Sequence, residues 1–246
     1  MRSLPSGRPD SRAAFLKGRR YAHRGLHGAG LVENSQAAFR AAIANGDGIE
    51  LDVQESRDGQ AIVFHDYTLH RLTAETGPLA DRTAAELAQI QLSNTAEGLS
   101  SLNQTLNLIA GRAPLLIEIK SRERTPARLC AAVRDALADY AGPVAVMSFN
   151  PQAARWFATH APHIVRGLVV TEEGKKSFRG WWERHLALWR ARPDFLAYDV
   201  RDLPSRFAAA ARAAGLPVLS WTVRSPADEA TVALHADAPI YERTLG

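Results

Sequence analysis

Two acidic side chains interrupt a segment that otherwise has the pattern of a buried β-strand. Glu50 and Asp52 alternate with Ile49, Leu51 and Val53 in the stretch DGIELDVQE. Successive side chains of a strand point to opposite faces, so the two carboxylates point the same way. Burying an unpaired carboxylate is costly, and burying two together is costlier. We therefore expect a positively charged partner beside this strand.

A second apolar run, LLIEIK, places Glu118 and Lys120 two residues apart and so on one face of a strand. Converging carboxylate oxygens are the ligands that hard divalent cations require. One lysine cannot balance three carboxylates. The residues therefore predict one divalent cation (Mg²⁺, Ca²⁺ or Mn²⁺) bound by Glu50, Asp52 and Glu118, with a purely structural salt-bridge network as the alternative.

Polar side chains also follow two other short apolar runs. The stretch AHRG contains His23 and Arg24, and VFHD contains His65. Two histidines beside a metal ion can supply acid–base catalysis near neutral pH, and the planar guanidinium suits phosphate oxygens. With Lys120, this set is what an in-line displacement at phosphorus needs. Which histidine is the acid and which is the base is left open; the other six histidines are expected to be structural or on the surface.

The composition is that of an ordinary globular protein. The chain has 246 residues, of which 46% are hydrophobic and 23% charged, with a formal net charge of +4. This weak positive bias suits a small phosphodiester substrate and is too small to predict binding of nucleic acid. The single cysteine, Cys130, is expected to pack inside a helix. With neither an export signal nor a membrane-spanning run, the sequence predicts a soluble cytoplasmic protein.

Short β-branched or apolar runs alternate along the chain with longer segments of helical periodicity. This alternation is typical of parallel strands joined by helical crossovers. At this length, eight such units predict the α/β class and a (β/α)₈ TIM barrel. The expected strands are Arg20–Ala22, Ile49–Val53, Leu115–Ile119, Val144–Met147, Ile164–Val170, Phe195–Ala197, Val218–Trp221 and Pro239–Tyr241.

The segment between the second and third of these strands is too long for a simple connection. We expect a small insertion there, at roughly residues 66–103. No linker rich in proline, glycine or serine divides the chain, so residues 1–246 are interpreted as one domain.

The stretch SFRGWWERHLALWRA carries three tryptophans at helical spacing. The preferred interpretation is a barrel helix that packs this stripe on the sheet. The alternatives are a face that forms a homodimer or that rests on a membrane surface.

Taken together, these stretches resemble the glycerophosphodiester phosphodiesterase family over nearly the whole chain. The segment AHRGLHGAGLVENSQAAFRAAIANGDGIELDVQESRDGQAIVFHD is similar in order and spacing to that family's HRG…EN-S/T…AF…G…IE-x-D-V…DG…V-x-HD signature. YTLHRLTAETG, LLIEIK and LSWTV continue the resemblance. The motifs are short one by one, but the ordered set is specific.

The resemblance implies hydrolysis of glycerophosphodiesters to sn-glycerol 3-phosphate and an alcohol. It also implies a divalent metal at the three carboxylates, His23 and His65 as the acid–base pair, and phosphate contacts from Arg24 and Lys120. By the same resemblance, Asn34 and Trp221 lie at the pocket.

The sequence departs from the family pattern near its end. Arg224 stands where the family has the asparagine of WTVN, and HADAPIYERTLG retains little of the usual last strand. The departures leave the metal ligands and histidines intact, so they are expected to affect the shape of the substrate that the pocket accepts and not hydrolysis itself. The alternatives are a phospholipase D-like activity on lysophospholipids and a non-catalytic phosphate-binding barrel. Attack on phosphorus by a substrate hydroxyl and attack by water both remain open.

Overall fold

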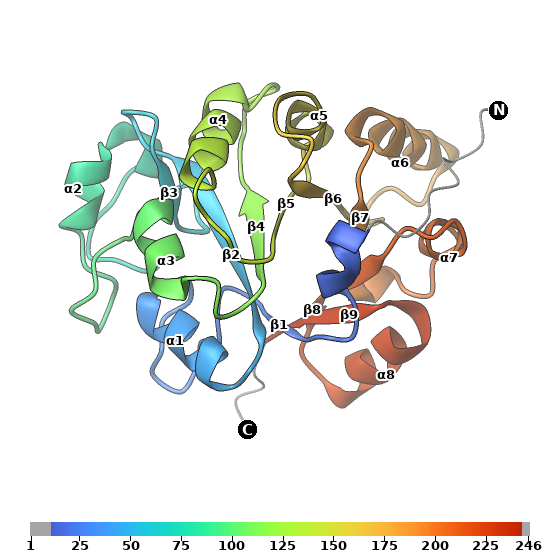
Figure 1. The fold of residues 1–246 in the computed structure, drawn as a ribbon, viewed down its shortest axis with the longest axis horizontal. Coiled ribbons are helices and arrows are strands. Elements are labelled where there is room, and N and C mark those ends of the chain that lie inside the picture. The colour runs from blue at the N-terminus through green and yellow to red at the C-terminus, as the bar shows by residue number, and fades with distance from the viewer. Residues whose placement is uncertain (1–10, 243–246) are drawn as a thin grey trace. The chain divides into compact units, whose positions relative to one another are not determined.

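The computed structural model describes residues 11–242, which form two compact units. One unit consists of residues 22–144, and the other of residues 11–21 and 145–242. In Figure 1 the first unit is coloured blue to green and most of the second yellow to red. Each unit is described by itself below.

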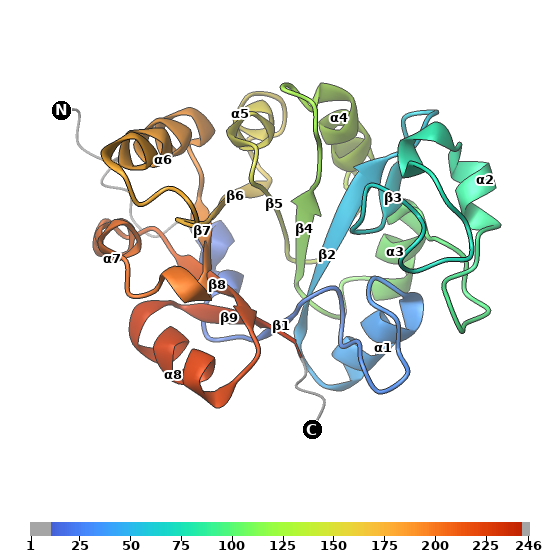
Figure 2. The ribbon, with the colours of Figure 1, turned by 180° about the vertical axis from the view of Figure 1, so that it is seen from behind.

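The unit of residues 22–144 is built on a sheet in the order β3-β2-β4. Strand β2 (Gly48–Glu55) pairs in parallel with β4 (Leu115–Ile119) and antiparallel with β3 (Ala61–Val63). Both views of the ribbon show β2 and β4 side by side (Figures 1 and 2). The helices of this unit are α1 (Gln36–Ala44), α2 (Ala84–Ala88), α3 (Leu102–Ile109) and α4 (Ala127–Ala136), with the 3₁₀ turn η2 (Leu79–Asp81).

Local sequence explains where these elements begin. Ser35 caps α1 by accepting a hydrogen bond from the Ala38 amide, as expected for a serine before an apolar helix. Strand β2 is buried on both faces, which is typical of a parallel sheet. Cys130 is fully buried in α4, and burial raises the pKa of its thiol to about 12, so the expected packing role is confirmed.

The segment between β3 and α3 contains η2 and α2, and it lies beyond β3 at the edge of the sheet (Figures 1 and 2). Its apolar side chains pack with β3 in a hydrophobic cluster made by Ile62, Phe64, Leu69, Leu79, Leu87, Leu92 and Leu99. An insertion after the second strand of the barrel is therefore present. The exact bounds 66–103, and the interpretation of the whole chain as one domain, stay predictions.

The other unit contains five parallel strands in the order β5-β6-β7-β8-β9. They are β5 (Val144–Ser148), β6 (Val165–Val170), β7 (Phe195–Asp199), β8 (Val218–Val223) and β9 (Ala238–Tyr241). Helices follow β5 to β8 in turn: α5 (Pro151–His160), α6 (Phe178–Ala191), α7 (Arg206–Ala213) and α8 (Pro226–His235). Short 3₁₀ segments η1 (Ser11–Leu16) and η3 (Val200–Asp202) complete it.

With β1 (Tyr21–Ala22), the described chain has eight strands that alternate with helices, and their positions match the expected ones to within two residues at each end. β3 is additional, because it is the second arm of a hairpin rather than a barrel strand. Among residues 11–242, the helices are too short or too polar to cross a membrane.

Candidate active site

Three carboxylates meet where β2 and β4 run in parallel. Glu50 and Asp52 point the same way from β2, and Glu118 on β4 is the register partner of Asp52. One oxygen from each of the three lies within 4.8 Å of the others. Their exposed fractions are 0%, 1% and 8%. The carboxylate cluster predicted from alternation along the two strands is therefore present, in the unit of residues 22–144.

Hydrogen bonds from protein donors reach only one oxygen of each β2 carboxylate. Oε2 of Glu50 accepts a hydrogen bond of 2.9 Å from the Arg24 amide, and Oδ2 of Asp52 accepts one of 3.0 Å from the Asn34 side chain. The other oxygens, Glu50 Oε1 and Asp52 Oδ1, are buried without a hydrogen-bond partner. Buried acceptors of this kind are costly unless something binds them. The donor set, three carboxylates with two oxygens that accept no hydrogen bond, fits a hard divalent cation.

The electrostatics of the cluster point the same way. Burial, together with the charges of Asp52 and Glu118, raises the pKa of Glu50 well above its usual range. Burial also raises the pKa of Glu118 to about 7, although Lys120 opposes the shift. For Asp52, the positive charges of Lys120 and Arg24 outweigh burial and lower the pKa. Of the three carboxylates, only Asp52 thus has a lowered pKa, and the ionised forms of Glu50 and Glu118 are disfavoured in the absence of a further positive charge.

Two basic side chains, Lys120 after β4 and Arg24 in the loop after β1, lie beside the cluster. Lys120 Nζ lies 3.5 Å from Asp52 Oδ1 and 3.2 Å from Glu118 Oε1. Arg24 Nε lies 3.3 Å from Asp52 Oδ2. Both side chains are largely buried, with 13% and 16% exposed. The predicted grouping of these two cations with the carboxylates is present.

The loop after β1 brings Arg24 and Asn34 to the cluster through an unusual backbone. Both residues have left-handed φ angles, 55° and 56°, and the Asn34 amide donates a 2.8 Å hydrogen bond to the Arg24 carbonyl. Gly25 follows with φ 77°, and a Cβ there would lie 2.9 Å from the Cβ of Ala38. Only glycine allows this close approach to α1 at a positive φ. This turn directs the Arg24 amide toward Glu50.

The two predicted histidines lie beside the same carboxylates. His23 Nε2 is 3.9 Å from Glu50 Oε2, and the ring is mostly buried. His65 follows β3, and its Nδ1 lies 2.6 Å from Asp66 Oδ1. Both histidines lower the pKa of Asp52, as positive charges near a carboxylate do. The structure therefore brings both rings to the cluster.

The state of the His65 ring follows from its neighbour. Although its partial burial opposes ionisation, hydrogen bonds from Arg71 and His65 lower the pKa of Asp66 to about 2. At neutral pH this carboxylate is ionised and can only accept, so Nδ1 of His65 carries the proton. Burial lowers the pKa of His65 itself. The ring is then neutral, with an unprotonated Nε2.

Sequence reasoning missed the ionic chain that holds these loops together. Arg71 binds Glu33 through two contacts of 3.0 and 2.6 Å and also binds Asp66 through two nitrogens. Glu33 in turn accepts a 2.8 Å hydrogen bond from Arg24 Nη1. The chain thus runs from His65 through Asp66, Arg71 and Glu33 to Arg24. Glu33 lies in the stretch LVEN, Asp66 in HD and Arg71 in HRLT. No regular spacing in the sequence indicates that these residues contact one another.

A lysine at position 71 tests this ionic chain. Because an ammonium cannot form two forked pairs at once, Arg71→Lys is expected to lower kcat about tenfold or more by loosening His65 and Arg24. Arg82→Lys is the matched control, because Arg82 is similarly exposed and pairs singly with Glu75. Steady-state kinetics of both variants make the comparison. Equal kcat values for them would contradict a positioning role for Arg71.

The comparison with family models decides the affiliation of the chain. The model of the Glycerophosphoryl diester phosphodiesterase family matches residues 23–242, which include the carboxylate cluster and both histidines. The chain belongs to this family.

Curated relatives carry the same family name. A glycerophosphodiester phosphodiesterase of Bacillus altitudinis is 37% identical over 107 residues, which are 41% of this chain and 43% of the relative. One from Caldanaerobacter subterraneus is 33% identical over 160 residues, 60% of this chain and 65% of the relative. The matched part of the chain thus spans less than two thirds of either relative's length.

Solved structures of the family have the same fold. A phosphodiesterase of Oleispira antarctica, in complex with the product sn-glycerol-3-phosphate, is 25% identical with a TM-score of 0.82, covering 93% of this chain and 94% of its own. A glycerophosphodiester phosphodiesterase of Thermotoga maritima is also 25% identical, with a TM-score of 0.73 and coverage of 90% and 92%. The (β/α)₈ barrel class predicted from the sequence is confirmed.

Two residues discussed for the glycerophosphoryl diester phosphodiesterase pattern lie in the other unit. Trp221, on β8, donates through Nε1 to the Ala197 carbonyl at 2.9 Å and packs edge-on against Phe149. Its place at the pocket stays a prediction. Arg224, which departs from the family pattern, binds both carboxylate oxygens of Glu242 at 2.6 and 3.1 Å. Glu242 belongs to the stretch HADAPIYERTLG, the second departure from the family pattern. The two departures therefore contact each other through this ion pair.

Proposed function

We propose that this protein hydrolyses glycerophosphodiesters to sn-glycerol 3-phosphate and an alcohol. The observation that carries the proposal is the buried cluster of Glu50, Asp52 and Glu118, in which two carboxylate oxygens accept no hydrogen bond and beside which two histidines lie. Membership of the family supports it, and so does the product bound to the Oleispira antarctica relative. A non-catalytic binder would not need two histidines beside the three carboxylates.

Glu50, Asp52 and Glu118 would bind one divalent cation. When bound, such an ion would neutralise negative charge on the phosphodiester and make an oxygen nucleophile easier to deprotonate. The protein contributes the orientation of the carboxylates, because Arg24 and Asn34 fix one oxygen of Glu50 and of Asp52. Lys120 limits the negative charge that remains.

Arg24 and Lys120 would bind the phosphate. Both are charged at neutral pH: the neighbouring carboxylates raise the pKa of each above its usual value although burial opposes this. The guanidinium of Arg24 is already oriented by Glu33 at 2.8 Å and by Asp52 at 3.3 Å. A preorganised cation of this kind stabilises charge in the transition state without reorganising.

His65 is the residue suited to accept a proton. Its ring is neutral, Asp66 fixes the proton on Nδ1, and Nε2 carries a free lone pair. The carboxylate of Asp66 also stabilises the imidazolium that forms. His23 is then the residue that donates a proton to the leaving alcohol. A cyclic phosphate trapped from a quenched reaction would identify a substrate hydroxyl as the nucleophile, and labelled oxygen from water in a single turnover would identify water.

The deciding assay measures release of glycerol 3-phosphate from glycerophosphocholine and glycerophosphoethanolamine, with and without EDTA. We expect release that EDTA abolishes and that added Mg²⁺, Mn²⁺ or Ca²⁺ restores. Parallel reactions with lysophosphatidylcholine test the phospholipase D-like alternative. Activity that survives EDTA would refute the metal site, and failure with every phosphodiester would refute the proposed activity.

Thermal unfolding provides a test that needs no substrate. Divalent cations bind the folded carboxylate cluster far better than the unfolded chain, so Mg²⁺, Mn²⁺ or Ca²⁺ should raise Tm. At a cation concentration a hundred times the Kd, the stabilisation is about 2.7 kcal/mol, which a scan detects easily. An unchanged Tm with all three cations would contradict the site.

A further inference from the structure

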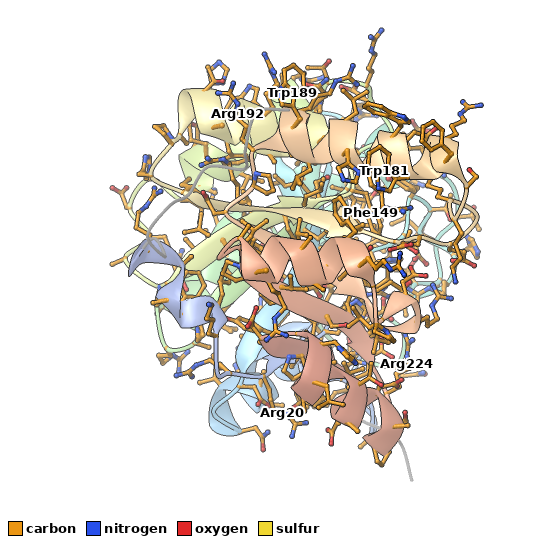
Figure 3. The ribbon with its side chains drawn as sticks, turned by 90° about the vertical axis from the view of Figure 1, so that its right-hand side faces the viewer. Arg20, Phe149, Trp181, Trp189, Arg192 and Arg224 are labelled. Atoms are coloured by element: carbon orange, nitrogen blue, oxygen red, sulfur yellow. The ribbon has the colours of Figure 1, made fainter. Side chains whose placement is uncertain are left out.

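Helix α6 lies between β6 and β7, as expected of a barrel helix, but its aromatic residues do not pack on the sheet, so that part of the interpretation from the sequence is wrong. Among the described residues, the exposed large hydrophobic side chains fall mainly on this helix: Phe178 is 76% exposed, Trp181 42%, Trp182 56%, Leu186 42% and Trp189 65%. These five residues are called the aromatic face of α6. Trp181 and Trp189 lie toward opposite ends of the helix (Figure 3).

Small and polar residues form the opposite, inward side of α6. Gly180 and Ala191 are its buried residues. A Cβ at Gly180 would lie 2.0 Å from the Lys175 carbonyl oxygen, so the helix approaches the preceding loop too closely for a side chain. Arg184 points inward as well, with 10% of its side chain exposed, and lies 3.4 Å from Glu172. This packing fixes the rotation of the helix and leaves the aromatic face outward.

The aromatic face is continuous at its amino-terminal end. The Phe178 ring is stacked on Trp181 with centroids 6.0 Å apart, and Trp182 meets Trp181 edge-on at 5.2 Å. Side chains of this size, exposed together on one helix, are unusual on a monomeric protein and mark an interaction surface. Tryptophan in particular is enriched where proteins meet the lipid–water interface.

Basic residues accompany this face. Six basic side chains and one acidic one occur between residues 175 and 192. Five of the six are exposed: Lys175, Lys176, Arg179, Arg190 and Arg192. An amphipathic helix with tryptophan on one side and lysine or arginine beside it is typical of proteins that lie on anionic membranes.

We propose that the aromatic face of α6 is a docking surface for an anionic phospholipid bilayer. Charge complementarity favours lipid over a second copy of the chain. A twofold contact through this face would bring the same exposed cations together, whereas anionic headgroups neutralise them. The tryptophans would insert at the level of the headgroups.

Co-sedimentation with vesicles tests the proposal on the full chain, independently of any catalytic activity. We expect binding to vesicles of phosphatidylglycerol and phosphatidylcholine, weak binding to phosphatidylcholine alone, and a loss of binding as salt rises. Three of the five tryptophans lie on α6, so their emission should shift to the blue on docking. Recovery of the unaltered protein in the supernatant with anionic vesicles would overturn the proposal.

Substitutions separate the aromatic from the electrostatic contribution. The double variant Trp182→Ala/Trp189→Ala is expected to weaken partitioning roughly tenfold or more. Lys176→Gln/Arg190→Gln should weaken it about fivefold for each charge removed, on anionic vesicles only. Leu234→Ala is the control, because Leu234 is 73% exposed on α8, away from this helix. Circular dichroism and Tm verify that each variant is folded.

Sedimentation velocity without lipid tests the alternative that a second copy of the chain covers the aromatic face of α6. The proposal expects a monomer whose sedimentation coefficient does not change with concentration or with the tryptophan substitutions. A dimer that dissociates in Trp182→Ala/Trp189→Ala would assign the aromatic face to contact between copies of the chain. That result would overturn membrane docking.

Discussion

Replacing Glu50 with glutamine should strongly reduce hydrolysis and, in the same protein, raise the stability of the metal-free state. Glutamine preserves the shape of the side chain and the oxygen that accepts the Arg24 amide at 2.9 Å. It removes one of three negative charges that a divalent cation would need. We expect kcat/KM to fall at least about a hundredfold and the cation-induced rise in Tm to disappear.

The gain in stability should depend on pH in a defined direction. The pKa of Glu50 is raised in the folded protein, so the metal-free fold binds this proton more tightly than the unfolded chain does. The stability that this bound proton contributes is fully present below the unfolded pKa of 4.5, and it is lost as pH rises through the folded pKa. Glu50→Gln removes this loss, and its advantage in Tm should be small at pH 4.5 and grow toward pH 8.

Ionisation of Glu118 should destabilise the metal-free fold in the same direction, by an amount that follows from its pKa. Its pKa moves from 4.5 to about 7, so ionising it costs the metal-free fold up to about 3 kcal/mol between those pH values. Thermal scans in EDTA from pH 4.5 to 8 measure both effects. Glu75→Gln, at an exposed position of the same unit, should change neither activity nor Tm. A Glu50→Gln protein that is less stable than the parent in EDTA at pH 8 would contradict the account of the cluster.

Removing either histidine should reduce turnover without affecting the cation. Acid–base catalysis contributes roughly 10²–10⁴-fold, so His23→Ala and His65→Ala are expected to lower kcat by that range. Since the carboxylates remain, both variants should keep the cation-induced rise in Tm. This combination separates the histidines from the metal site.

The pH profile distinguishes the two histidines. Burial lowers the pKa of His65 below its ordinary value of 6.5, so the acidic limb of kcat/KM should have its midpoint below pH 6.5. That limb should be absent in His65→Ala. His70→Ala is the control, because His70 is exposed and contacts only Thr68 among the hydrogen bonds described. A full rate in either His23→Ala or His65→Ala would refute the role proposed for that residue.

The part of the site that follows from local periodicity could be predicted from the sequence. The two-residue spacing of Glu50 and Asp52 within an apolar strand, and of Glu118 and Lys120 in the next, fixes the face on which they lie. That Asp52 pairs with Glu118 depends on the register of β2 and β4, which only the fold supplies.

Other features depend on contacts that no sequence pattern encodes. Arg24 and Asn34 reach the cluster because both adopt left-handed backbone, a conformation that is uncommon for arginine and more frequent for asparagine. The link between Glu33 and Arg71 joins loops 38 residues apart. For α6 the helical periodicity was right and the direction of the stripe was wrong, because a period shows that one face is apolar and not whether that face is buried. Gly180 and Ala191, rather than tryptophan, make the buried side.

If a cation completes the site, the two buried oxygens that accept no hydrogen bond, Glu50 Oε1 and Asp52 Oδ1, would have a consequence for the lifetime of the protein in a cell. A chain whose folded state is less stable without its cation spends more time unfolded, and unfolded chains are what proteases degrade. Scarcity of divalent cations would then lower the amount of this protein as well as its turnover number. Its abundance would report on the metal supply of the cell even when no substrate is present.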